Sequence, residues 1–293
     1  MTNEKKSILF TLSAVFFWST VATAFKLTLN GISFVQLLFW ASLTSTIVFF
    51  IISVKENQKI FEILFSKKYL TRNILLGFIN PFLYYMVLFK SYELLPAQEA
   101  QPLNYTWPIM ISIFAVLFLK EKISLKIIIG LFISFSGVIV LATHGNIFAF
   151  KFDNLWGTLL ALGSSVIWAT FWTLKLKDKR PASVKLFSAF FFGTLFTLIY
   201  ILFFDKFVIP QTKYLIGAIY VGLFEMGITF FLWMKGISLS TNQSKTSTLA
   251  YLSPFVSLLF IAFILGEKIL PSSIVGLTLI ISGILFQHLK TSE

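Results

Sequence analysis

The chain has 293 residues, of which 57% are hydrophobic and 12% are charged, and its mean hydropathy is +0.86. A soluble domain carries about 25% charged residues, so this composition excludes an ordinary soluble enzyme and a disordered chain, while the absence of cysteine excludes a disulfide scaffold. The net charge of +12 does not indicate nucleic-acid binding, because the basic residues lie in short loops between apolar segments.

Ten apolar segments are long enough to cross a bilayer, since a spanning helix needs about 20 mostly apolar residues. We predict transmembrane helices over residues 8–28, 33–54, 73–92, 97–119, 125–143, 157–176, 184–204, 214–236, 243–265 and 272–289. The first segment could be mistaken for a signal peptide, but it is long for one and the sixth segment resembles it, so we expect it to be retained. The fold class is therefore all-α integral membrane, with no room for a soluble domain.

The Lys and Arg residues divide unequally between the two sets of loops. With the N-terminus inside, sixteen of them fall in the inside set, and four fall outside: Lys151, Lys206, Lys213 and Lys268. Positive residues favour the cytoplasmic side of a membrane protein. The asymmetry predicts a multi-pass protein of the cell inner membrane with both termini in the cytoplasm.

The two halves of the chain repeat each other. Trp18-Ser19-Thr20 in the first span matches Trp168-Ala169-Thr170 in the sixth. Further pairs share an offset of 146 residues: Tyr105 with Tyr251, Pro108 with Pro254, Glu121 with Glu267, Gly130 with Gly276 and Gly137 with Gly283. Each copy has five spans, and an odd number inverts the second copy in the membrane. We predict two inverted five-helix repeats, residues 1–146 and 147–293, forming one membrane domain of the kind that supports alternating access.

The segment from Gly130 to Gly137 and the pairs Glu121-Lys122 and Glu267-Lys268 resemble the pattern of the drug/metabolite transporter superfamily in its ten-span EamA-type form, over the whole chain. The motif Asn104-Tyr105-Thr106-Trp107-Pro108, with Glu99 upstream and Phe17-Trp18-Ser19-Thr20 near the start, resembles the branch that includes the aromatic amino-acid exporters. It implies a permease that moves amino acids out of bacterial cells without ATP. Glu225 and Lys245 depart from the pattern of the family, where apolar or small residues are commoner.

Glu225 lies eleven residues into the eighth span, which at ~1.5 Å per residue places it about 16 Å deep, near the bilayer midplane. A carboxylate at this depth is costly and usually faces the protein interior or a water-filled cavity. We predict either a proton-coupling site or a counter-charge for a substrate ammonium group. The structural alternative is a neutral carboxyl group hydrogen-bonded to a neighbouring helix.

Glu99 and Lys245 occupy equivalent places in the two repeats, in the first turns of spans four and nine. Because the repeats are inverted, we expect them near opposite faces rather than in an ion pair. Each could place a charge at one mouth of the pathway. Alternatively, Lys245 reaches the headgroup region and Glu99 favours the dipole of its helix N-terminus.

The remaining candidates are polar and aromatic side chains within the spans. Pro96, Pro102 and Pro108 predict a kinked, interior fourth span, because carbonyl groups freed by proline need partners away from lipid. Tryptophan offers an apolar wall and one N–H donor, although packing alone explains most single instances. The predicted substrate-binding residues are Trp18, Asn80, Tyr84, Gln98, Glu99, Asn104, Tyr105, Trp107, Trp168, Trp172 and Tyr251.

Several motifs are absent from the sequence. There is no nucleotide-binding GxxxxGK[ST] loop and no HExxH zinc motif, and the chain has two histidines. We expect no cofactor, no metal, no nucleic-acid partner and no enzyme activity. We predict a secondary-active or facilitative exporter of amino acids or similar small zwitterions. We expect its transport pathway to be lined by spans one, three, four, six, eight and nine. Another metabolite, a nucleotide-like cofactor or a cationic drug remains the alternative cargo, and a monomer and a homodimer both remain open.

Overall fold

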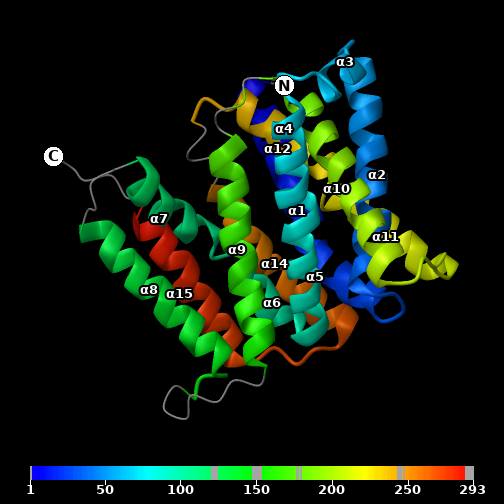
Figure 1. The fold of residues 1–293 in the computed structure, drawn as a ribbon. Helices are drawn as coiled ribbons and strands as arrows, with labels where there is room; N and C mark the ends of the chain where they lie inside the picture. Colours follow the sequence, from blue (N-terminus) through cyan, green and yellow to red (C-terminus); the bar gives the residue numbers. More distant parts are fainter. Residues whose placement is uncertain are drawn as a thin grey trace.

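The computed structural model describes residues 2–119, 125–146, 154–175, 178, 180–242, 246 and 248–287, and each of the ten predicted spans contains helices (Figure 1). In the first half the helices are α1 (Asn3–Leu29), α2 (Phe34–Lys55), α3 (Ile60–Leu64), α4 (Leu70–Gly77), η1 (Phe78–Leu83), α5 (Tyr84–Leu94), α6 (Ala97–Asn104), α7 (Trp107–Leu119) and α8 (Leu125–Ala142). In the second half they are α9 (Leu155–Lys175), α10 (Ala182–Phe204), α11 (Thr212–Phe224), α12 (Ile228–Leu239), η2 (Thr248–Leu252), α14 (Ser253–Phe260), η3 (Ile261–Leu265) and α15 (Pro271–Gln287).

The surface of this bundle is apolar, as a bilayer requires. Eight of the described helical segments are long and apolar enough to cross a membrane, and α15 is an apolar helix of 17 residues. The side chains of Phe132, Phe203 and Phe263 are 75%, 78% and 85% exposed. Exposed apolar surface on this scale marks contact with lipid or another apolar partner. The chain is an all-α integral membrane protein, as its composition predicts.

Three of the predicted spans are broken inside the membrane. The third span changes from α4 to α5 through the π-helical turn η1, where Asn80 is extended (φ −147°, ψ 121°) and the Asn80–Pro81 peptide bond is cis. The fourth span stops at Asn104 and restarts at Trp107, so the kink expected from its prolines is a full break. The eighth span is also broken, between Phe224 and Ile228, where the sequence predicted one continuous helix.

Helices α8 and α15 pack directly against each other and show the repeat symmetry most clearly (Figure 1). A Cβ atom on Gly137 would lie 2.6 Å from the carbonyl oxygen of Gly276, and one on Gly130 would lie 2.6 Å from that of Gly283. Gly137 thus meets Gly276, the repeat equivalent of Gly130, and Gly130 meets Gly283, the repeat equivalent of Gly137. Such reciprocal contacts define a two-fold axis between antiparallel helices.

The same axis passes through two further contacts. Ser134 Oγ donates to the carbonyl oxygen of its repeat equivalent Ile280 at 3.1 Å. On the far side of the bundle, Thr46 and Thr194 hydroxyls lie 3.1 Å apart, and each is the thirteenth residue of its helix, α2 and α10. The repeats also exchange partners, since α1 packs on α12 while α9 packs on α5. The fold is therefore two interlocked, inverted five-helix repeats; the predicted boundary at residue 146 stays a prediction.

A buried ionic cluster ties the segment before α10 to α4. Arg180 donates from Nη2 to Asp178 Oδ2 at 2.7 Å and from Nη1 to Asn73 Oδ1 at 2.8 Å, and Arg72 Nε lies 3.6 Å from Asp178 Oδ2. Burial raises the pKa of Asp178, but hydrogen bonds from Arg180 and the charges of Arg180 and Arg72 outweigh it and hold the pKa below its usual value. The carboxylate is therefore charged and paired at neutral pH.

We expect Gly137→Ala to destabilise the protein by about 1–3 kcal/mol, because the added methyl group collides with the backbone of α15. Gly163→Ala in α9 is the matched control: nothing lies within 4 Å of its Cβ position, so its unfolding temperature should be unchanged or raised. Thermal unfolding of the purified protein in detergent measures both. Equal losses for the two variants would contradict close packing at the two-fold axis.

We expect Asp178→Asn to lower the unfolding temperature at pH 7. A carboxyl group whose pKa is lowered in the folded state stabilises it above the unfolded pKa and stops doing so as the pH falls through the folded pKa. The gap between wild type and variant should therefore narrow as pH falls below about 4. Glu62→Gln, from the exposed pair with Lys59, is the control and should change little. A gap that stays constant with pH would show that the charge of Asp178 is not responsible.

Candidate functional site

A small cavity of about 80 Å³ lies where the broken spans meet. It is lined by parts of spans one, three, four, six, eight and nine, the six that the sequence predicts around a pathway. Pockets for drug-sized ligands measure roughly 300–1,000 Å³, so this one suits a smaller molecule. Its lining residues are Trp18, Val21, Phe25, Tyr84, Leu88, Tyr92, Gln101, Asn104, Tyr105, Trp107, Trp168, Glu225, Phe230 and Ala250.

Glu225 reaches this cavity because the eighth span is interrupted beside it. The residue caps the C-terminus of α11, and Gly227 follows with a non-helical backbone (φ −112°, ψ −101°). The hydroxyl of Thr229 donates to the freed carbonyl of Phe224 at 2.6 Å. This carbonyl therefore has a hydrogen-bond partner within the protein, which lipid could not provide. The carboxylate of Glu225 is half-buried and accepts a hydrogen bond from the hydroxyl of Tyr85 at 3.2 Å.

Asn104 holds the break in the fourth span against two neighbouring helices. Its Oδ1 accepts from the hydroxyl of Tyr84 on α5 at 3.3 Å, and its Nδ2 donates to Ser164 Oγ on α9 at 2.8 Å. Thr106 Oγ1 donates to the carbonyl oxygen of Leu103 at 2.7 Å, which gives a freed acceptor a partner inside the protein. These bonds fix the position at which Tyr105 and Trp107 enter the cavity lining.

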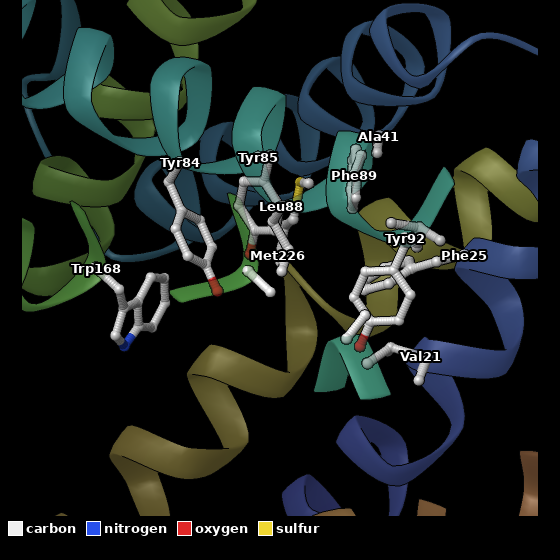
Figure 2. Packing of buried hydrophobic residues seen from close by; sticks show 14 of the residues in the cluster. Val21, Phe25, Ala41, Tyr84, Tyr85, Leu88, Phe89, Tyr92, Trp168 and Met226 are labelled. Atoms are coloured by element: carbon white, nitrogen blue, oxygen red, sulfur yellow. The ribbon is translucent and has the colours of Figure 1, made fainter. Parts of the chain in front are cut away.

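The walls of the cavity are aromatic. Figure 2 shows Tyr84, Tyr85 and Tyr92 projecting from α5, with Trp168 beside Tyr84 and with Val21 and Phe25 of α1 beside Tyr92. The ring centroids of Tyr84 and Trp168 are 4.7 Å apart, and those of Phe25 and Tyr92 are 5.1 Å apart. Flat rings of this kind bind apolar side chains, and their faces attract an ammonium group.

Seven of the twelve residues singled out from the sequence line the cavity together: Trp18, Tyr84, Asn104, Tyr105, Trp107, Trp168 and Glu225. The other five do not line it. Asn80 is buried in η1, and Trp172 packs one turn beyond Trp168, with ring centroids 5.9 Å apart. Tyr251 lies half-buried in η2. Gln98 and Glu99 are buried at the end of the bundle where α6 begins. Lys245 lies outside the described residues.

The N-terminus of α6 is capped by a residue from the opposite repeat. Glu267 accepts from the backbone nitrogens of Ala97 at 3.0 Å and Gln98 at 3.3 Å. The side chain of Gln98 extends this contact, because its Oε1 accepts from Leu270 N at 3.0 Å and from Ser273 Oγ at 2.9 Å. The repeat-matched Glu-Lys motif is thus a helix cap that joins the two repeats at this end.

Two more contacts strengthen the same end of the bundle. Glu99 Oε1 lies 2.9 Å from His144 Nε2, in the turn after α8. Lys26 Nζ, near the end of α1, donates to the carbonyl oxygens of Tyr92 at 2.8 Å and Leu95 at 3.0 Å. Glu99 is therefore paired with His144 at the end of the bundle where α6 begins, and Lys26 closes the C-terminus of α5. The predicted role of Glu99 at a mouth of the pathway stays a prediction.

Sequence reasoning missed Tyr92 and Gln101, two residues with polar groups that line the cavity, and Gln101 is the more informative of the two. The side chain of Gln101 is 2% exposed, and its Oε1 has no hydrogen-bond partner among the residues that the structure describes. A buried acceptor without a partner is costly, which points to a ligand or water at this place. Its spacing of three residues from both Gln98 and Asn104 could have identified it as part of one helix face.

The chemistry of the lining residues selects among ligands. Among the described residues that line the cavity, Glu225 alone carries a formal charge, and none is Lys or Arg. Hydroxyl and indole groups of Tyr105, Trp107 and Trp168 supply donors. In the part of the chain that the structure describes, no three His, Asp or Glu side chains come together as a metal site. The cavity thus suits a small ligand with a cationic group and an apolar part.

The chain is similar to known transporters. Its residues 5–143 and 155–287 match the model of the EamA-like transporter family. An uncharacterized transporter of Acidianus ambivalens is 29% identical over 76% of this chain and 87% of its own. Aromatic amino acid exporter YddG of Salmonella typhimurium is 27% identical over 70% of this chain and 75% of its own. A solved crystal structure with 18% sequence identity covers 96% of both chains with a TM-score of 0.68, which shows a shared fold.

We expect Glu267→Ala to lower stability by about 0.5–2 kcal/mol, the usual loss for a helix cap, because two backbone donors of α6 lose their acceptor. Thermal unfolding in detergent measures this loss. Glu93→Ala is the control, since Glu93 forms a half-exposed pair with Lys90 that should contribute less than about 1 kcal/mol. If the two variants behave alike, Glu267 does not hold the α6 terminus.

Proposed function

This chain belongs to the EamA-like transporter family, and we propose that it exports amino acids or similar small zwitterions from the cell by alternating access. Members of this family are membrane transporters rather than enzymes, so a small-molecule cargo and a surrounding bilayer follow from membership. The cargo, the direction and the coupling are the proposal. The observation that supports it is that Gln101 and Glu225 line the same small aromatic cavity.

Gln101 and Glu225 supply acceptors for the ammonium group of the cargo. Gln101 Oε1 has no hydrogen-bond partner among the residues that the structure describes, and the Glu225 carboxylate keeps acceptor sites beyond its bond to Tyr85. Hydrogen bonds to charged groups contribute about 1.5–3 kcal/mol, enough to select amines over neutral analogues. The negative charge of Glu225 also balances the ammonium charge away from water.

The remainder of the cargo meets donors and rings. The hydroxyl of Tyr105 and the indole N–H groups of Trp107 and Trp168 are the donors available to a carboxylate. Tyr84 and Trp168 form a flat wall for an aromatic or large aliphatic side chain. Similarity to the YddG aromatic amino acid exporters of two bacteria supports this cargo. The described residues that line the cavity include no Lys or Arg, which disfavours multiply anionic metabolites.

Alternating access requires that the contacts at the α6 end break and re-form. Glu267, Gln98 and Glu99 join α6 to α15 and to the turn after α8, and they lie between the cavity and that end of the bundle. The opposite end holds the N-terminus and α3 (Figure 1). It also carries Lys55, Lys59, Lys67, Lys68, Arg72 and Arg180. This excess of positive charge supports cytoplasmic termini in an inner membrane.

Glu225 is the proposed coupling residue. It lies at a helix break, faces the cavity and contacts Tyr85, so a change in its protonation alters both the ligand site and the α11–α12 junction. Proton exchange through Glu225 makes transport respond to a pH gradient. Facilitated diffusion, in which Glu225 acts as a fixed counter-charge, does not.

We expect proteoliposomes containing the protein to take up labelled phenylalanine and leucine saturably and to do so faster under an imposed pH gradient. Glu225→Gln should abolish the response to the gradient. Glu93→Gln, which changes an exposed residue at the end of α5, should retain it. Gradient-independent uptake by the wild type would make the protein a facilitator. No uptake of any amino acid by folded protein would overturn the cargo, and uptake of a cationic drug instead would identify the alternative.

The ammonium contact is tested with analogues in the same assay. Gln101→Leu should raise KM for phenylalanine about tenfold, the equivalent of one charged hydrogen bond, without changing inhibition by 3-phenylpropionate, which lacks the ammonium group. Equal loss of both ligands would show that Gln101 only shapes the cavity.

A further inference from the structure

A second, larger cavity opens on the lipid-facing side of the bundle between α1, α11 and the α14–η3 segment. Its volume is about 590 Å³. We call this cavity the lateral groove. Its lining residues are Thr20, Thr23, Ala24, Leu27, Thr28, Asn30, Lys213, Tyr214, Ile216, Gly217, Tyr220, Phe260 and Ile264. None of them lines the central cavity, so the groove is a separate site.

The groove is open to the hydrocarbon of the bilayer. Leu27, Ile216 and Ile264 at its edges are 45%, 61% and 54% exposed. Its inner end is closed by a hydrogen bond of 2.7 Å between the hydroxyls of Thr20 and Tyr220. An apolar hollow that faces lipid is filled by an apolar chain, since neither water nor a vacuum is favourable there.

One end of the groove is charged. Lys213, at the start of α11, is the one charged residue among the described residues that line the groove, and its ammonium group lies 4.5 Å from the ring centroid of Tyr214. None of these described lining residues is acidic. Lys213 and Tyr220 are seven residues apart on one helix, which is about 10 Å along the bilayer normal. The positive end therefore lies near headgroup depth and the apolar part reaches into the roughly 30 Å core.

Close helix contact gives the groove its depth. A Cβ atom on Gly217 would lie 2.3 Å from Thr28 Oγ1, so α11 approaches α1 closely at this level. Both Gly217 and Thr28 line the groove, so the close contact between the two helices forms part of its lining.

We propose that the lateral groove binds one anionic phospholipid, with an acyl chain between α1, α11 and η3 and the phosphate beside Lys213. Charge complementarity selects the anionic headgroup, since a lone cation with no acidic neighbour in the lining attracts it by about 1 kcal/mol. The acyl chain fills the apolar hollow. Helix α1 then lies between this lipid and the central cavity, because Val21 and Phe25 face the cavity while Ala24 and Leu27 face the groove.

Native mass spectrometry of the detergent-purified full chain, titrated with phosphatidylglycerol or phosphatidylcholine of equal acyl chains, tests this inference. We expect one tightly retained phosphatidylglycerol per chain and weaker retention of phosphatidylcholine. Lys213→Gln should reduce phosphatidylglycerol retention about fivefold and leave phosphatidylcholine unchanged. Lys206→Gln, which removes an exposed charge at the same end but outside the groove, is the matched control and should have no effect.

A second variant tests the apolar part. Ala24→Phe fills the groove and should reduce retention of both lipids, with thermal unfolding used to confirm that the protein is folded. If the Ala24→Phe variant does not fold, Ile216→Trp at the exposed edge of the groove serves as the filling variant in its place. Equal retention of the two headgroups, equal effects of the Lys213 and Lys206 variants, or undiminished binding in the filled groove would each overturn the proposal. None of these results depends on the transported cargo.

Discussion

The structure depends on one constraint. The core of a bilayer holds no water, so every backbone polar group there needs a hydrogen-bond partner within the protein. The chain nevertheless breaks three spans within the membrane. At two of these breaks a hydroxyl group binds a carbonyl group, because Thr229 donates to Phe224 and Thr106 donates to Leu103. At the end of the bundle, Glu267 accepts from the first backbone donors of α6. The polar residues of the central cavity, Asn104 and Glu225 among them, lie at these same breaks. Interior helix ends and a ligand site are thus one arrangement, since both need polar partners shielded from lipid.

The two-fold relation between the repeats gives this arrangement a way to work. Reciprocal glycine contacts join α8 to α15, and matched threonines join α2 to α10. The exchange of α1 and α9 between the repeats places both around the cavity, so Trp18 and Trp168 line it from opposite repeats. A bundle built from two equivalent units has two equivalent arrangements in principle, which is the physical basis of alternating access.

The sequence predicted what depends on local composition and periodicity. Hydropathy located all ten helical segments, and the 146-residue offset found the glycines that meet at the axis. It did not predict which face of α6 borders the cavity, because Gln98 is engaged by Leu270 and Ser273, more than 170 residues away, whereas Gln101 is left free for the cavity. The break after Phe224 was also missed, since a lone Gly227 in an apolar run does not distinguish a tolerated glycine from a helix end. Such pairings between distant segments leave no local signal.

The exchange of helices between the repeats also constrains how the protein is made. The first five segments leave the ribosome before α9 and α12 exist, so α5 and α1 enter the membrane without the helices that later cover them. At that stage Asn104 has no Ser164 to bind, and the capping carboxylate of Glu267 has not yet been synthesised. The N-terminal repeat must therefore wait in the membrane with polar helix ends unpaired. The contacts of Asn104 with Ser164 and of α6 with Glu267 can therefore form only after the second repeat has been translated, so the packing of the first repeat is completed by the second.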